Sequence, residues 1–176
     1  MSGVLLGPGG EFDVIREILA GAAGGPDLLA VGPGDDAAVL ARPGRILSTD
    51  MTVEGVHYLR EWLSPEEVGY RAAAAALSDL AAMGAEARAV LVSLAASSSD
   101  ARSGYLARVG RGTREAAEAV GAVLAGGDVT RSPGPLVVDV VVVGDTDAPV
   151  LRSGARSGDG IWVTGELGGA AAAVWL

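Results

Sequence analysis

The 176-residue sequence contains no cysteine and no lysine, and it has a single histidine, His57. Without cysteine there can be no disulfides, thiolate metal sites or cysteine nucleophiles. Without lysine there can be no Walker A lysine, no strand lysine of the protein-kinase type and no Schiff-base chemistry. One histidine also excludes zinc sites built from several histidines. Any phosphate bound by this chain must therefore be held by arginine, backbone amides or metal ions.

Long apolar runs and positive charge are also scarce. The longest apolar run, over 136–143, is interrupted by Asp139, and no window reaches the roughly 20 apolar residues of a membrane span. Residues 1–10 lack the basic region and apolar stretch of a signal peptide. The net charge of −9 argues against a nucleic-acid-binding surface and suits a protein that recruits divalent cations. We therefore expect a cytoplasmic protein that binds neither nucleic acid nor membrane.

The chain is long enough for one domain, and its 49% hydrophobic residues argue against disorder. Ser64, Pro65 and Glu67 form a strong helix start with a capping box, and Gly84 is a typical stop. We expect an α/β (α+β) sandwich with the helices on one face of a mixed sheet. The predicted helices cover 11–22, 64–83 and 100–120. The predicted strands and extended segments cover 28–31, 37–40, 45–48, 89–94, 123–125, 136–144 and 161–164.

Four short motifs place aspartates where predicted elements end. Carboxylates repel one another, so several converge in one pocket only when cations hold them there. Hard oxygen ligands of this kind suit Mg²⁺ bound together with substrate phosphates. The motifs are Gly32-Pro33-Gly34-Asp35-Asp36, Ser48-Thr49-Asp50, Leu77-Ser78-Asp79 and Gly126-Gly127-Asp128.

Each motif also has a plainer explanation. Aspartate, serine, threonine and glycine dominate ordinary turns, although paired glycines can also turn backbone N–H groups toward phosphate. Asp79 lies near the C-terminal end of an apolar helix, where the helix dipole disfavours negative charge. It is either solvated or balanced by a metal ion or a distant arginine. His57 is more simply a histidine packed in a core, and Arg152 an ordinary surface arginine.

Taken in order, these segments resemble the thiamine-monophosphate kinase family, in its N-terminal part. That family belongs to the ATP-binding superfamily of aminoimidazole ribonucleotide synthetase and selenophosphate synthetase. The stretch from Ser48 is the most distinctive, and the matches cover nearly the whole chain. They are Gly10-Glu11-Phe12 with Ile15, GPGDDAAV from Gly32, STDMTVEGVHY from Ser48, LSDLAAMGA from Leu77, GGDVTRS from Gly126 and LRSGARSGD from Leu151.

The resemblance implies a fold, a reaction and an assembly. The fold is the N-terminal domain of the aminoimidazole ribonucleotide synthetase-like fold, whose sheets pair across a homodimer. The reaction moves the γ-phosphoryl group of ATP onto thiamine monophosphate, with several Mg²⁺ ions, to give thiamine diphosphate. Residues 1–150 correspond to the ATP- and Mg²⁺-binding and dimerisation domain, and 151–176 begin the connection into a C-terminal domain.

The resemblance also implies roles for particular residues. Gly127, Asp128 and Arg152 match nucleotide contacts, and His57 matches a position that contacts the thiamine phosphate. No catalytic base is implied. The positions that match Mg²⁺ ligands are Asp36, Ser48, Thr49, Asp50, Asp79 and Asp128.

Two alternatives remain open on the sequence alone. The chain could belong to another branch of the superfamily: an aminoimidazole ribonucleotide synthetase, a selenophosphate synthetase or a hydrogenase maturation factor. The last two depend on cysteine or other residues that are missing here. It could also be a non-catalytic module that dimerises and binds nucleotide.

Overall fold

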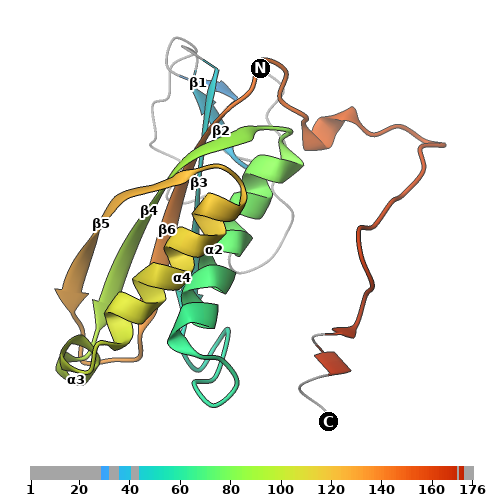
Figure 1. Cartoon of the computed structure of the whole chain (residues 1–176). Coiled ribbons are helices and arrows are strands. Elements are labelled where there is room, and N and C mark those ends of the chain that lie inside the picture. The colour runs from blue at the N-terminus through green and yellow to red at the C-terminus, as the bar shows by residue number, and fades with distance from the viewer. Residues whose placement is uncertain (1–28, 32–35, 41–43, 170, 173–176) are drawn as a thin grey trace.

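The computed structural model describes residues 29–31, 36–40, 44–169, 171 and 172. The predicted helix over 11–22 and residues 32–35 of the first aspartate motif lie outside the described residues. The described part forms one mixed six-stranded sheet with two long helices packed side by side on one of its faces (Figure 1). This confirms the predicted fold class. None of the described helices is long and apolar enough to cross a membrane.

The strands lie in the order β1-β2-β3-β6-β4-β5, and only β4 and β5 pair in parallel. The long helices α2 and α4 pack on this sheet, while α3 and the 3-10 helix η1 are short. The strands are β1 (Leu29–Val31), β2 (Ala38–Leu40), β3 (Arg45–Val53), β4 (Glu86–Ala96), β5 (Val123–Arg131) and β6 (Val137–Asp145). The helices are α2 (Pro65–Ala82), α3 (Ser98–Arg102), α4 (Tyr105–Ala119) and η1 (Arg152–Gly154).

Strand β6 defines the two faces of the sheet. Val138, Val140 and Val142 are fully buried on the face that carries the helices, which we call the helix face. The alternate residues of β6 are only partly buried and lie on the opposite face, which we call the open face. Because paired residues share a face, the register of each strand assigns its side chains to one face or the other.

Helix α2 begins as the sequence predicts. The Ser64 hydroxyl accepts a hydrogen bond from the Glu67 N–H at 3.3 Å, and the Glu67 carboxylate accepts one from the Ser64 N–H at 2.7 Å. This capping box satisfies two N–H groups that the helix itself cannot.

Replacing the cap residue should therefore weaken the fold measurably. We expect Ser64→Ala to lower the free energy of unfolding by about 1 kcal/mol in urea denaturation. Ser153→Ala is the matched control, because Ser153 lies exposed in η1. Equal stability of the two variants would contradict the capping role.

One predicted helix is divided into two, and one predicted strand is absent. The helix expected over 100–120 is broken at Gly104, whose φ of +77° is left-handed, so α3 and α4 are separate helices. The strand expected over 161–164 does not form, and Ile161 and Trp162 are 97% and 92% exposed. Their β-favouring side chains have no neighbouring strand to pair with among the described residues.

Three other predicted strands are too short, and the one expected over 89–94 extends from Glu86 to Ala96. The strands expected over 45–48 and 123–125 continue to Val53 and Arg131, because their neighbours β6 and β4 offer pairing partners that far. The second and fourth aspartate motifs therefore lie within strands instead of in loops after them.

Candidate functional site

Strand β3 and helix α2 bring the second and third aspartate motifs together. The Ser48 hydroxyl donates a hydrogen bond to the Asp79 carboxylate at 2.5 Å and lies 3.3 Å from the backbone carbonyl of Asp36. Ser48 and Asp50 pair with the buried Val142 and Val140, so both lie on the helix face. We call Asp36, Ser48, Asp50 and Asp79 the carboxylate cluster. It lies by the C-terminal part of α2, which carries Asp79.

Without a cation, the cluster is an unfavourable environment for the negative charge of Asp79. Burial raises the pKa of Asp79, the hydrogen bond from Ser48 lowers it, and the charges of Asp36 and Asp50 raise it further. Arg152 of η1 lowers it slightly, and its guanidinium donates to the Asp36 carboxylate, with Nε 3.0 Å from Oδ1. The distant arginine foreseen for Asp79 is therefore present, but it pairs with the neighbouring Asp36.

The donor set of the cluster fits a hard cation. It consists of carboxylate and hydroxyl oxygens, the ligands that Mg²⁺ prefers. Among the described residues, however, no three acidic or histidine side chains lie close enough to hold a metal ion as they stand. The carboxylates would have to turn toward one another to share a cation.

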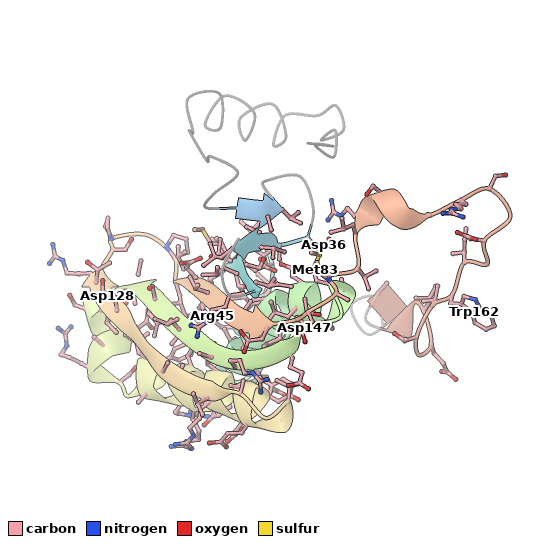
Figure 2. All side chains as sticks on the ribbon, turned by 90° about the horizontal axis from the view of Figure 1, so that it is seen from above. Asp36, Arg45, Met83, Asp128, Asp147 and Trp162 are labelled. Carbon is pink, nitrogen blue, oxygen red and sulfur yellow. The ribbon has the colours of Figure 1, made fainter. Side chains whose placement is uncertain are left out.

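Thr49 and Asp128 do not belong to this cluster. The Thr49 hydroxyl donates to Asp139 Oδ1 at 2.8 Å on the open face. Asp128 of β5 pairs with Ser93 of β4, which pairs in turn with Asp139 of β6. These side chains share the open face, and Figure 2 shows Asp128 on the outer strand, away from Asp36. The sheet thus separates two of the six predicted metal ligands from the other four.

Asp139 was not singled out as a site residue on the sequence alone. The signal was nevertheless present, because it is a charged residue within a run of valines.

Gly127 has a structural reason to be glycine. A Cβ at this position would lie 1.8 Å from the Val92 carbonyl oxygen across the β4–β5 pair, whereas one at Gly126 would meet nothing within 4 Å. Close strand packing accounts for Gly127 without a phosphate.

His57 lies in the turn that follows β3, with Gly55 at a left-handed φ of +78°. The Val53 N–H donates a hydrogen bond to His57 Nδ1 at 2.9 Å. The proton of the neutral ring must therefore be on Nε2, and the exposed ring offers an N–H donor. Val53 lies three residues beyond Asp50 and five beyond Ser48 along β3, about 10 and 17 Å at roughly 3.3 Å per residue, so the end of β3 that carries His57 is separated from the carboxylate cluster.

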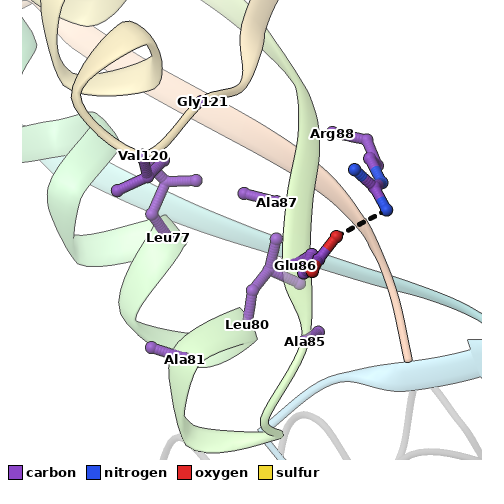
Figure 3. Close-up of a pocket in the computed structure, with 9 residues that line it drawn as sticks. All are labelled: Leu77, Leu80, Ala81, Ala85, Glu86, Ala87, Arg88, Val120 and Gly121. Atoms are coloured by element: carbon purple, nitrogen blue, oxygen red, sulfur yellow. Dashed lines mark ion pairs between the residues drawn. The ribbon is translucent and has the colours of Figure 1, made fainter. Parts of the chain in front are cut away.

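Two cavities lie apart from these residues. One of about 400 Å³ is lined by Leu77, Leu80 and Val120, with the Glu86–Arg88 ion pair beside it (Figure 3). Another of about 260 Å³ lies between α3 and the end of β5, next to Arg102 and Arg131. Neither is lined by a predicted site residue.

Comparison with known proteins supports one family. Residues 34–146 match the model of the AIR synthase related protein, N-terminal domain. The thiamine-monophosphate kinase of Mycobacterium tuberculosis is 42% identical over 172 residues, which are 94% of this chain and 51% of that protein. The crystal structure of thiamine monophosphate kinase from Aquifex aeolicus is 30% identical with a TM-score of 0.68, covering 86% of this chain and 46% of that one. A structure of AaThiL complexed with AMPPCP and TMP is 31% identical with a TM-score of 0.70, covering 83% and 44%.

The chain spans about half the length of the curated relatives that it matches. The family model covers most of the described sheet and both long helices, from the first aspartate motif to the end of β6. The chain therefore belongs to the family of AIR synthase related proteins and carries that family's N-terminal domain.

Proposed function

We propose that the protein containing this chain transfers the γ-phosphoryl group of ATP to thiamine monophosphate and forms thiamine diphosphate. The observation that carries the proposal is the carboxylate cluster, in which four oxygen-bearing side chains from three segments lie together on the helix face. It is supported by relatives named thiamine-monophosphate kinase and by a related structure in complex with AMPPCP and TMP.

We assign Asp36, Ser48, Asp50 and Asp79 as ligands of Mg²⁺. When bound, the metal would neutralise phosphate charge and align the groups that react. It would also offset the repulsion that raises the pKa of Asp79. Arg152 would then turn from Asp36 to a nucleotide phosphate, since arginine is the only cationic phosphate ligand that the sequence provides.

The acceptor needs no general base. A phosphate monoester has a second pKa of roughly 6 and is largely a dianion at neutral pH. The main obstacle is repulsion between two anionic phosphates, which cations and arginine address. His57 would serve as a binding residue, because its Nε2–H can donate to a substrate oxygen.

A second copy of the chain would give the residues on the open face a role. We propose that two open faces pair in a homodimer, so that Thr49, Gly127 and Asp128 serve a site to which both chains contribute. Exposed apolar side chains in this sheet support pairing, since Met51 is 53% and Leu91 37% exposed. Residues 1–150 would form the ATP- and Mg²⁺-binding and dimerisation domain, and 151–176 the start of the connection to a second domain.

The test is an assay of the full-length protein in which this chain occurs. We expect thiamine diphosphate and ADP to form in equal amounts, only with Mg²⁺ and ATP. Asp50→Asn should lower the rate roughly a hundredfold or more, because one charged metal ligand is lost. Asp147→Asn, on an exposed loop, should leave the rate unchanged.

An Asp50→Asn enzyme as active as the parent would refute the metal assignment. ATP turnover that requires an acceptor other than thiamine monophosphate would refute the substrate and favour another branch of the superfamily.

A further inference from the structure

The turn that carries His57 is closed at its base by an ion pair. Arg60 Nε lies 2.6 Å from Glu54 Oε1, and Arg60 Nη2 lies 2.7 Å from Glu54 Oε2. This two-point contact joins the residue that precedes the turn to the residue that follows it. His57 lies midway between them in the sequence.

The same guanidinium also joins the turn to the helices α3 and α4. Arg60 Nη1 and Nη2 donate to the two carboxylate oxygens of Asp100 in α3, at 2.6 and 3.0 Å. The guanidinium carbon also lies 4.5 Å from the centre of the Tyr105 ring at the start of α4. We call Glu54, Arg60 and Asp100 the Arg60 clamp.

Both carboxylates of the clamp are held from their other side. The Leu136 N–H donates to Glu54 Oε2 at 3.1 Å, and the Glu54 N–H donates to the Leu136 carbonyl at 3.0 Å. Asp100 is only 7% exposed and accepts a hydrogen bond from the Ser97 hydroxyl at 2.8 Å. The turn is therefore attached to β3, to the chain entering β6 and to α3.

Such a contact is stronger than an ordinary surface ion pair. The side chains of Glu54 and Asp100 are 23% and 9% exposed and that of Arg60 is 36% exposed, so solvent screens these contacts only in part. Four charge-assisted hydrogen bonds use the planar fork of arginine, which a lysine could not reproduce. Arg60 lowers the pKa of both carboxyls, as expected for ion pairs that form in the folded chain.

The hydrogen bonds within the turn decide which ring nitrogen of His57 carries the proton. Within the turn, the His57 N–H donates to the Val53 carbonyl at 2.9 Å, and the Gly55 N–H donates to the Tyr58 carbonyl at 2.8 Å. In this closed turn the Val53 N–H also reaches His57 Nδ1, so the ring folds back over the backbone that the clamp encloses. If separation of Glu54 and Arg60 lets the turn open, Nδ1 would lose its donor and the ring proton could reside on either nitrogen.

We propose that the Arg60 clamp is a positioning device that holds the turn closed and keeps the proton of His57 on the outward-facing Nε2. Arg60 and Asp100 are then positioning residues, and they act through His57. Their consequence for substrate binding rests on the proposed kinase function. Their effect on the histidine ring does not.

The single histidine makes the effect directly observable. ¹⁵N NMR of the imidazole ring, at alkaline pH and without assignment ambiguity, distinguishes the two neutral forms. In the parent chain we expect the Nε2–H form to dominate. Arg60→Gln and Asp100→Asn should shift both ring nitrogens toward the values of an unconstrained neutral histidine, in which both forms are populated.

Two further variants separate positioning from folding. Arg60→Lys keeps the charge but not the fork, and it should also shift the ring signals while leaving the circular dichroism spectrum unchanged. Arg108→Gln breaks a different ion pair, between α4 and Glu66 of α2, and should leave the histidine signals as in the parent. Unchanged ring signals in folded Arg60→Lys and Asp100→Asn proteins would overturn the proposal.

The kinetic test uses the full-length protein. Arg60→Lys should raise the KM for thiamine monophosphate roughly tenfold, because the released turn no longer holds the His57 donor in place, with the KM for ATP unchanged. If the ring signals shift while the KM for thiamine monophosphate does not change, the clamp positions His57 but His57 does not bind the substrate.

Discussion

Gly112→Ala is expected to destabilise the chain by about 3 kcal/mol, a large part of the total stability of a domain of this size. A Cβ at Gly112 of α4 would lie 1.8 Å from the Glu66 carbonyl oxygen and 2.9 Å from the Tyr70 nitrogen in α2. Gly69 of α2 is its counterpart, because a Cβ there would lie 1.9 Å from the Val109 carbonyl oxygen. The two helices thus touch backbone to backbone, and neither position can accept a methyl group unless the helices move apart.

Gly110→Ala is the matched control for this prediction. Gly110 lies in the same helix, and a Cβ there would meet nothing within 4 Å. Alanine should stabilise the helix at this position by up to about 1 kcal/mol. Urea denaturation of the two variants measures the difference. Equal midpoints would show that α2 and α4 do not approach as closely as described.

Asp79→Asn is expected to act in opposite directions on stability and on metal binding. In the metal-free chain, burial and the charges of Asp36 and Asp50 raise the pKa of Asp79 above its ordinary value of 3.8. The folded state then holds the Asp79 proton more tightly than the unfolded state does. Asp79 therefore favours folding most at low pH, and this contribution is lost as pH rises from about 4 through the raised pKa.

Asparagine keeps an oxygen that can accept the Ser48 hydrogen bond and carries no charge. With a chelator present, the melting temperature of Asp79→Asn should therefore exceed that of the parent at neutral pH, and the difference should shrink toward pH 4. Added Mg²⁺ should raise the melting temperature of the parent but not of the variant. A variant less stable than the parent at neutral pH without metal would show that Asp79 is not under the electrostatic strain described.

Much of the fold follows from local signals. Helix α2 has its cap, its proline and its terminal glycine within the segment itself, so both of its ends could be predicted to within about one residue. The valine-rich composition of β6 is sufficient to predict a buried strand. The grouping of Ser48 with Asp79 could be expected only through the aspartate motifs, since the two residues are 31 positions apart.

Other features depend on partners that the sequence does not reveal. Gly104, Gly110 and Gly112 look alike as helix-weakening residues. The first breaks the helix, the second faces open space and the third permits the contact with α2. Residues that lie beyond the end of a predicted strand cannot be assigned to a face until the true length and register of the strand are known. For that reason Thr49 and Asp128 were expected beside Asp50 and lie on the other face.

The Arg60 clamp illustrates the same limit. Its arginine and Asp100 are 40 positions apart, and neither belongs to a motif. Only the folding of α3 against the turn after β3 makes them partners.

The most direct test of the account is to find where a divalent cation binds. Mn²⁺ can replace Mg²⁺ at oxygen sites, and its paramagnetism broadens nearby NMR signals. Titrating Mn²⁺ into the isotope-labelled chain should first broaden the backbone amides around Ser48, Asp50 and Asp79, and Asp79→Asn should abolish this broadening. Broadening that begins instead around Asp128 and Asp139 on the open face, or that survives Asp79→Asn, would contradict the carboxylate cluster as the cation site.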